Sequence, residues 1–100
     1  MNTMKSKEMK FDNIKIAIIG LGCVGLPMAI KFSKKFDVVS YDTNPIRINE
    51  LKNGYDATGE IQSSILNKSN CEFTINEGNL ADCNVYINCE IFMRRELFNI

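Results

Sequence analysis

The chain has 100 residues, which is enough for one small domain. Its 12 basic and 12 acidic residues balance, so the composition does not predict a protein that binds nucleic acid or a membrane surface through bulk positive charge. A hydrophobic fraction of 45% and a charged fraction of 24% exclude wholesale disorder, and the longest aliphatic run, residues 16–19, is far shorter than the roughly 20 residues of a membrane-spanning helix.

The first half of the chain alternates between strand and helix patterns. Residues 1–13 are polar and predict a flexible lead-in, whereas the β-branched run at 15–19 is typical of a buried central strand of a parallel sheet. Apolar residues then recur at spacings of three and four as far as Phe36, which predicts a helix with Pro27 in its first turn. Residues 38–41 predict a second strand.

The second half continues the alternation. Asn44 and Pro45 predict the start of a helix that ends at Asn53-Gly54. A short helix is expected at 61–67, with Ile61, Ile65 and Leu66 facing inward. A third strand at 71–75, a single helical turn capped by Asn76 and a fourth strand at 84–88 complete the pattern.

This order predicts an α/β fold: an incomplete Rossmann-type parallel sheet of about four strands in the order 3-2-1-4, with helices on both faces. The fourth strand then forms an open edge that carries Val85, Tyr86 and Ile87. Open edges favour pairing with other chains, so we expect self-association unless residues 89–100 cover this edge.

The main chemical signal is the run Gly20-Leu21-Gly22-Cys23-Val24-Gly25 between the first strand and the first helix. The first glycine permits a tight turn, the second lets the backbone approach a pyrophosphate, and the third lets the helix pack close to the strand. Free N–H groups at the start of the helix would face the phosphates. The alternative is a glycine-rich turn without a ligand.

Asp42 ends the second strand 22 residues after Gly20, where a carboxylate can accept hydrogen bonds from both hydroxyls of an adenosine ribose. Its charge would repel a 2′-phosphate, so the sequence favours NAD over NADP. Two interpretations of Arg47 stay open: it reaches the adenosine side of the cofactor, or it is an ordinary surface arginine.

Four cysteines, at positions 23, 71, 83 and 89, lack the spacing of a zinc knuckle, and the chain has no histidine. We therefore expect no metal site, and reduced, mostly buried thiols in a cytoplasmic protein. A nucleophilic cysteine needs a base or a cationic neighbour, and the sequence offers no such pair, so it predicts no catalytic residue.

Residues 15–29, with Leu26-Pro27 after the third glycine, resemble the start of the UDP-glucose/GDP-mannose dehydrogenase family. The runs 36–42, 53–58 and 81–87 resemble its UDP-N-acetylhexosamine 6-dehydrogenases of capsule, Vi-antigen and O-antigen polysaccharide synthesis. The resemblance covers residues 14–88 and implies an NAD-binding domain that uses Gly20 to Gly25, Asp42 and Arg47. Cys23 replaces the family's tyrosine, which a loop that works through its backbone should tolerate.

Beyond Ile87 the resemblance stops, which indicates a changed reading frame, a truncated gene or a genuinely divergent helical tail at 89–100. Family members oxidise the C6 alcohol of a nucleotide sugar with a cysteine, a lysine and other groups that lie beyond this segment. The sequence therefore predicts an NAD-binding portion that is inactive alone. Alternatives are one half of a split dehydrogenase that a second chain completes, a regulatory nucleotide-sensing module, and a partly unfolded product without function.

Overall fold

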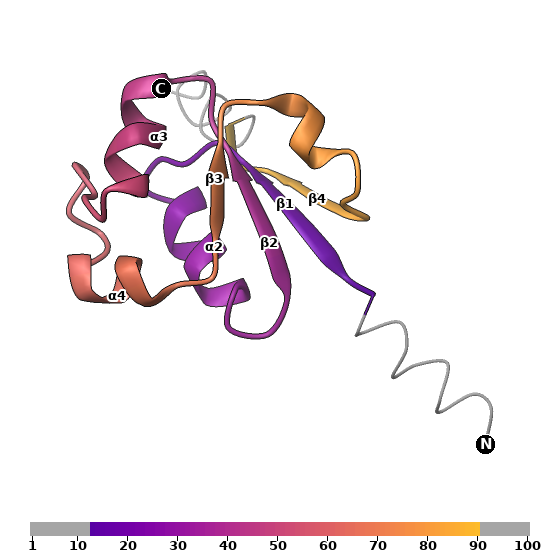
Figure 1. Cartoon of the computed structure of the whole chain (residues 1–100), viewed down its shortest axis with the longest axis horizontal. Helices are drawn as coiled ribbons and strands as arrows, with labels where there is room; N and C mark the ends of the chain where they lie inside the picture. The colour runs from indigo at the N-terminus through magenta and orange to yellow at the C-terminus, as the bar shows by residue number, and fades with distance from the viewer. Residues whose placement is uncertain (1–12, 91–100) are drawn as a thin grey trace, which may run out of the picture.

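The computed structural model describes residues 13–90, which build a four-stranded parallel sheet. Its strands are β1 (Lys15–Ile19), β2 (Asp37–Tyr41), β3 (Glu72–Thr74) and β4 (Val85–Asn88), and their spatial order is β3-β2-β1-β4. Figure 1 shows the four strands side by side. The predicted Rossmann-like topology is confirmed.

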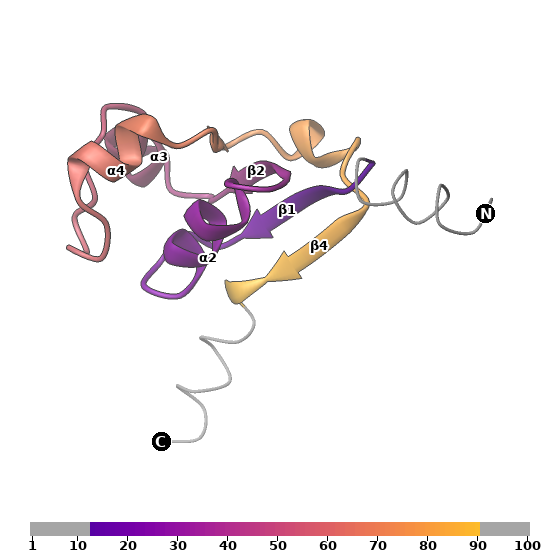
Figure 2. The same cartoon turned by 90° about the horizontal axis from the view of Figure 1, so that it is seen from below.

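Three helices lie on one side of this sheet: α2 (Gly25–Phe32), α3 (Pro45–Lys52) and α4 (Ser63–Lys68). The short 3₁₀ helix η1 (Glu77–Leu80) packs on the other face, next to β2 (Figures 1 and 2). This asymmetry follows from the connections, because right-handed crossovers put α2 and α3 on one face and send the link from β3 to β4 across the other.

The helix ends follow from the capping residues. The Asn44 side chain accepts a hydrogen bond from the Ile46 N–H at 3.0 Å, and Gly54 ends α3 with a φ of 80°. The Asn76 side chain caps η1 in the same way, through the Gly78 N–H at 2.9 Å. In contrast, α2 stops four residues before the predicted end at Phe36, because the chain turns after its C-cap residue Ser33.

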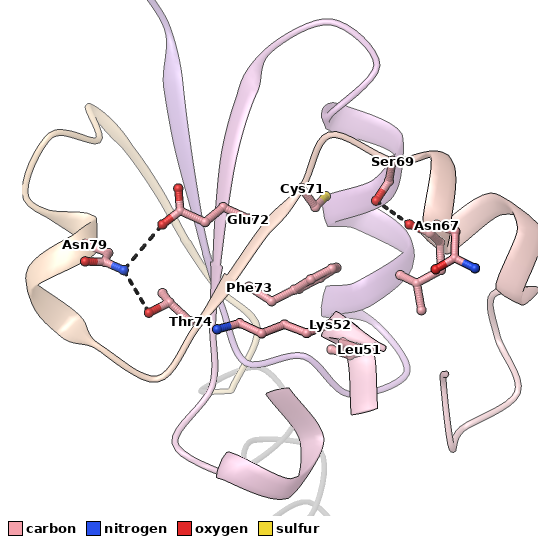
Figure 3. A pocket seen from close by; sticks show the side chains of 10 residues that line it. Leu51, Lys52, Asn67, Ser69, Cys71, Glu72, Phe73, Thr74 and Asn79 are labelled. Atoms are coloured by element: carbon pink, nitrogen blue, oxygen red, sulfur yellow. Dashed lines mark hydrogen bonds between the residues drawn. The ribbon is translucent and has the colours of Figure 1, made fainter. Parts of the chain in front are cut away.

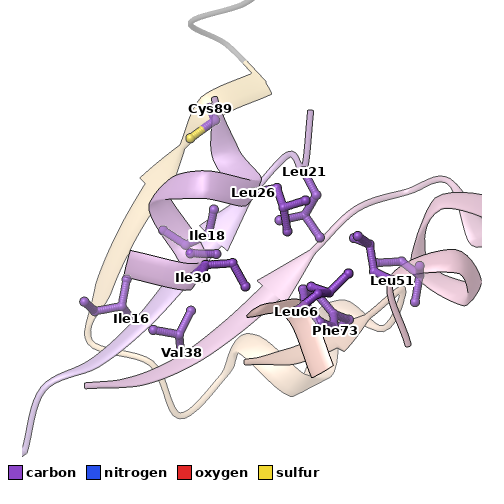
Figure 4. Close-up of a cluster of buried hydrophobic side chains, with 12 residues drawn as sticks. Ile16, Ile18, Leu21, Leu26, Ile30, Val38, Leu51, Leu66, Phe73 and Cys89 are labelled. Carbon is purple, nitrogen blue, oxygen red and sulfur yellow. The ribbon is translucent and has the colours of Figure 1, made fainter. Parts of the chain in front are cut away.

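The core has two layers, since successive strand residues point to opposite faces. Ile16 and Ile18 face the helices, whereas Ala17 and Val39 face η1. Figure 4 shows the larger layer. Its buried residues are Ile16, Ile18, Leu21, Leu26, Ala29, Ile30, Val38, Ile48, Leu51, Leu66, Phe73 and Cys89. Burial of each large aliphatic side chain contributes about 1.5–3 kcal/mol, so this layer supplies most of the stability.

One prediction about the core is wrong. Ile65 was expected to face inward from α4, but 46% of it is exposed. The helix has only six residues, and it turns Leu66 into the core while Ile61 packs beside it from the preceding loop.

The two edges of the sheet are β3 and β4. Within residues 13–90, β1 is the one strand paired with β4, whose Val85 and Tyr86 are 37% and 53% exposed. None of the helices in this part of the chain is long and apolar enough to cross a membrane. Residues 1–12 and 91–100, which include most of the predicted lead-in and tail, lie outside the described residues.

Candidate functional site

The site lies where parallel strands bring their carboxyl ends together. The glycine loop (residues 20–24) follows β1, Asp42 follows β2, and Cys89 and Glu90 follow β4. Together they line a cavity of about 180 Å³ beside the start of α2. The edge between β1 and β4 is also where the strand order reverses, which is the usual ligand crevice of open α/β sheets.

The three glycines at positions 20, 22 and 25 differ in why the structure needs, or does not need, a glycine there. Gly20 has a φ of +94°, which side-chain-bearing residues rarely adopt. A Cβ on Gly25 would overlap the carbonyl oxygen of Gly20, so the close contact between strand and helix requires glycine there. A Cβ on Gly22 would meet no atom of residues 13–90 within 4 Å. Packing among these residues therefore does not require glycine at position 22, and they leave the space above it open.

Asp42 contacts the glycine loop directly. Its Oδ2 accepts a hydrogen bond from the Leu21 N–H at 2.9 Å, and its Oδ1 accepts one from the Asn44 N–H at 2.9 Å. A carboxylate oxygen accepts at least two hydrogen bonds, so each oxygen of Asp42 keeps at least one acceptor position. Asp42 thus lies beside the loop and retains the capacity to bind two further donors.

Arg47 is not a surface residue, because only 8% of it is exposed. Its Nε donates to the carbonyl oxygen of Leu21 at 2.7 Å, and its Nη1 donates to Asp56 Oδ1 at 2.7 Å. Helix α3 places Arg47 on its buried face, next to Ile48 and Leu51. The surface-arginine interpretation is therefore wrong, while contact with a cofactor stays a prediction.

Asp56 was not among the predicted site residues, although it is the most heavily hydrogen-bonded side chain near the loop. Besides Arg47, it accepts hydrogen bonds from the Thr58 side chain and from the N–H groups of Thr58, Glu60 and Ile61. The Asp-x-Thr sequence of a tight turn, within reach of a helical arginine, was the available signal.

Glu90 lines the cavity from the β4 side. Its backbone nitrogen lies 2.9 Å from the position of a Cβ on Gly20, so this segment closes off one side of the loop. Two acids, Asp42 and Glu90, are among the described residues that line the cavity, and none of those residues is basic. The cavity is smaller than the roughly 300–1,000 Å³ typical of ligand pockets.

A larger cavity, of about 380 Å³, lies elsewhere, between α3, α4 and β3. Figure 3 shows Lys52, Phe73 and Thr74 along it, with Asn79 donating hydrogen bonds to Glu72 and Thr74. Its polar groups are thus largely engaged with each other. It contains none of the residues that the sequence singled out for chemistry.

Burial outweighs the activating neighbours of Cys71 and Cys83, such as Lys15 near Cys83. Burial raises the pKa values of Cys71, Cys83 and Cys89, which disfavours the thiolate. Cys71 donates to the Ala29 carbonyl oxygen at 3.2 Å, and Cys23 is exposed in the glycine loop. These three thiols, of which Cys83 and Cys89 are buried and Cys71 is partly buried, therefore fit a packing role better than a nucleophilic one.

Comparison with known proteins supports the fold and the resemblance. The chain is 46% identical over 76 residues to a UDP-N-acetyl-D-glucosamine 6-dehydrogenase of Pseudomonas aeruginosa, and 47% identical over 77 residues to that of Salmonella typhi. Over these residues the chain is similar to UDP-N-acetyl-D-glucosamine 6-dehydrogenases. A solved structure of UDP-D-ManNAc dehydrogenase from Pyrococcus horikoshii matches with a TM-score of 0.68 and 33% identity, so the resemblance predicted from the sequence is confirmed.

These matches are partial. They cover 75% and 76% of this chain but only 18% of each of the two curated relatives, and 76% of this chain but 20% of the solved structure. No family model matches the chain. The relationship therefore applies to one segment of these dehydrogenases.

Proposed function

We propose that this chain binds NAD through its adenosine diphosphate half, as the dinucleotide-binding portion of a UDP-sugar 6-dehydrogenase. The observation that carries the proposal is the open space at Gly22, at the start of α2 and beside Asp42. A ligand in this space would give that position a reason to be glycine. A diphosphate in this space would accept hydrogen bonds from loop amides and interact favourably with the N-terminus of α2.

The residues present fit this half of the cofactor. Among residues 13–90, the N–H groups of Gly22 and Cys23 have no backbone acceptor, which leaves them available to phosphate oxygens. The two remaining acceptor positions of Asp42 suit the two ribose hydroxyls and disfavour a 2′-phosphate. When bound, NAD would supply hydride acceptance for alcohol oxidation.

The fit is poorer on the β4 side, where Glu90 brings a negative charge next to the expected diphosphate. We therefore expect weak binding, of about micromolar to millimolar affinity, or about −8 to −4 kcal/mol. The groups that oxidise the sugar are proposed to lie outside residues 13–90, in the same polypeptide or in a second chain. The chain alone should then bind the cofactor without turning over a nucleotide sugar.

Calorimetric titration with NAD tests the proposal, with Asp42→Ala as the first variant. Loss of two charge-assisted hydrogen bonds, each of about 1.5–3 kcal/mol, should weaken binding at least tenfold and reduce the preference for NAD over NADP. Binding that Asp42→Ala leaves unchanged would contradict the ribose assignment.

Two glycine variants separate ligand binding from folding. Gly22→Ala should leave the thermal midpoint unchanged and weaken NAD binding, because the new methyl group occupies only the open space. Gly25→Ala should destabilise the fold, because its methyl group meets the Gly20 carbonyl. If Gly22→Ala binds NAD as tightly as the wild type, the loop is a turn without a ligand.

A further inference from the structure

Asp56 is a buried carboxylate without capacity for a ligand. Its Oδ1 accepts from Arg47 Nη1 at 2.7 Å, from the Thr58 N–H at 3.0 Å and from Thr58 Oγ1 at 2.7 Å. Its Oδ2 accepts from the N–H groups of Glu60 and Ile61, both at 2.9 Å. The side chain has no exposed surface. Five donors saturate this carboxylate, so any role it has at the glycine loop must act through Arg47.

Arg47 links this carboxylate to the loop. The guanidinium group is planar, so the contact of Nη1 with Asp56 fixes the direction in which Nε points. Nε points at the carbonyl oxygen of Leu21. The third nitrogen, Nη2, is buried and has no hydrogen-bond partner among residues 13–90, so the group is held by these two contacts.

The Leu21 carbonyl in turn determines the direction of the next amide. In a trans peptide the C=O and the following N–H point in opposite directions. Because the Leu21 carbonyl points at Arg47, the Gly22 N–H points away from it. Asp42 holds the preceding peptide through the Leu21 N–H. Two consecutive peptides of the glycine loop are thus fixed by side chains from outside it.

We propose that Asp56 is a positioning residue for the diphosphate: through Arg47 it holds the Leu21–Gly22 peptide so that the Gly22 N–H faces the ligand. The inference rests on the proposed function for the identity of the ligand. The sequence resemblance predicts that Arg47 reaches the cofactor itself. The present proposal instead has Arg47 hold the backbone of the loop, and it adds Asp56, from a separate turn, as the residue that orients Arg47.

The Arg47–Asp56 ion pair is expected to persist over the whole physiological pH range. Burial alone would raise the pKa of Asp56, but the hydrogen bonds from Thr58, Arg47 and Ile61 outweigh it and hold the pKa far below its usual range. Asp56 therefore stays ionised, and Arg47 stays paired, throughout the physiological pH range.

The test compares Asp56→Asn with Thr58→Val, which removes one hydrogen bond from the same carboxylate and leaves the Arg47 contacts in place. Two properties are measured: NAD affinity by calorimetry, and the Gly22 amide signal in a ¹H–¹⁵N NMR spectrum. Asp56→Asn should shift or broaden the Gly22 signal and weaken NAD binding about tenfold. Thr58→Val should leave both unchanged even if it lowers the thermal midpoint.

A third variant keeps the test decisive if Asp56→Asn does not fold. Arg47→Lys keeps a positive charge for Asp56 but lacks the fork that reaches Leu21, so it should reproduce the change in the Gly22 signal. An unchanged Gly22 signal in Asp56→Asn, or in Arg47→Lys if Asp56→Asn does not fold, would overturn the proposal. A wild-type chain that binds no NAD would instead contradict the proposed function, and the NMR comparison would still decide the positioning role.

Discussion

The two sides of the glycine loop are built very differently. On the β2 side, Asp42 accepts a hydrogen bond from the Leu21 N–H, and Arg47 donates one to the Leu21 carbonyl oxygen. Asp56 in turn holds Arg47 through a hydrogen bond to Nη1. On the β4 side, Glu90 makes close backbone contact with Gly20, and the outer strand leaves Val85 and Tyr86 exposed. Within residues 13–90, the β2 side, which is proposed to bind the ribose, is therefore pre-organised, whereas the β4 side is sparsely supported.

Under the proposed function, this difference means that residues 13–90 form the adenosine half of the dinucleotide site more completely than the other half. Fixed peptides and a positioned carboxylate lower the entropic cost of binding, because the ligand does not have to order them. Cys89 and Glu90, the described residues after β4, offer no such arrangement, and Glu90 adds a negative charge. The adenosine half of NAD should therefore contribute nearly all of the affinity.

The largest expected effect is on stability. Asp56→Ala leaves Arg47 buried without its partner and should reduce the free energy of unfolding by about 3–5 kcal/mol. Tyr86→Ala, on the β4 side, removes a half-exposed ring and its hydrogen bond to the Leu80 carbonyl, and should reduce it by about 1 kcal/mol. Urea denaturation measures both, and equal losses would contradict the contrast between the two sides.

The ion pair of Asp56 with Arg47 predicts that the free energy of unfolding depends on pH. The pKa of Asp56 is lowered in the folded chain, so its contribution is fully present above its unfolded value of 3.8 and is lost as the pH falls below it. The stability difference between the wild type and Asp56→Asn should be constant from pH 7 to about 5 and should shrink below pH 3.8. Asp82→Asn, which changes an exposed acid, is the control. A difference that persists unchanged at pH 2 would argue against the assignment.

A smaller effect is expected on the β4 side of the cavity. Glu90→Gln removes a charge next to the expected diphosphate and should tighten NAD binding about threefold at low salt, with a smaller gain at high salt. Asp37→Asn, at the opposite end of the sheet, is the matched control and should leave the affinity unchanged. Weaker binding by Glu90→Gln would mean that this carboxylate assists the ligand.

The smallest effect concerns the open edge. We expect wild-type chains to associate weakly through β4, and Val85→Lys should reduce this association because an edge lysine discourages strand pairing. Ile46→Lys makes the same chemical change on α3, where Ile46 is 70% exposed, and should not alter it. Light scattering at increasing concentration measures the result. Identical scattering by all three proteins would exclude the edge as the contact.

Most of the fold follows from local sequence patterns. The β-branched runs, the Asn44 and Asn76 caps and the stop at Gly54 define elements that the structure places close to the predicted bounds. Ile65 was misjudged because a helix of six residues turns too few positions inward for periodicity to show which one is buried. Short elements take their orientation from packing, which sequence spacing does not encode.

The site was only partly predictable, for a related reason. The glycine loop and Asp42 form a motif with a fixed spacing, which can be recognised in the sequence. The pairing of Arg47 with Asp56 depends on how the turn after α3 folds back beneath the loop. The approach of Glu90 to Gly20 depends on the register of β4 beside β1.

Asp42 has a consequence for any attempt to change the preferred cofactor. Its carboxylate holds the Leu21 N–H, and the same two oxygens would select the ribose hydroxyls. Replacement by a small or basic residue, the usual route to accommodating a phosphorylated ribose, would therefore also release the loop that is proposed to bind the diphosphate. Under the proposed function, cofactor selectivity and diphosphate binding both depend on the Asp42 side chain. Evolution or engineering toward NADP would therefore have to replace Asp42 and supply a new hydrogen-bond acceptor for the Leu21 N–H at the same time.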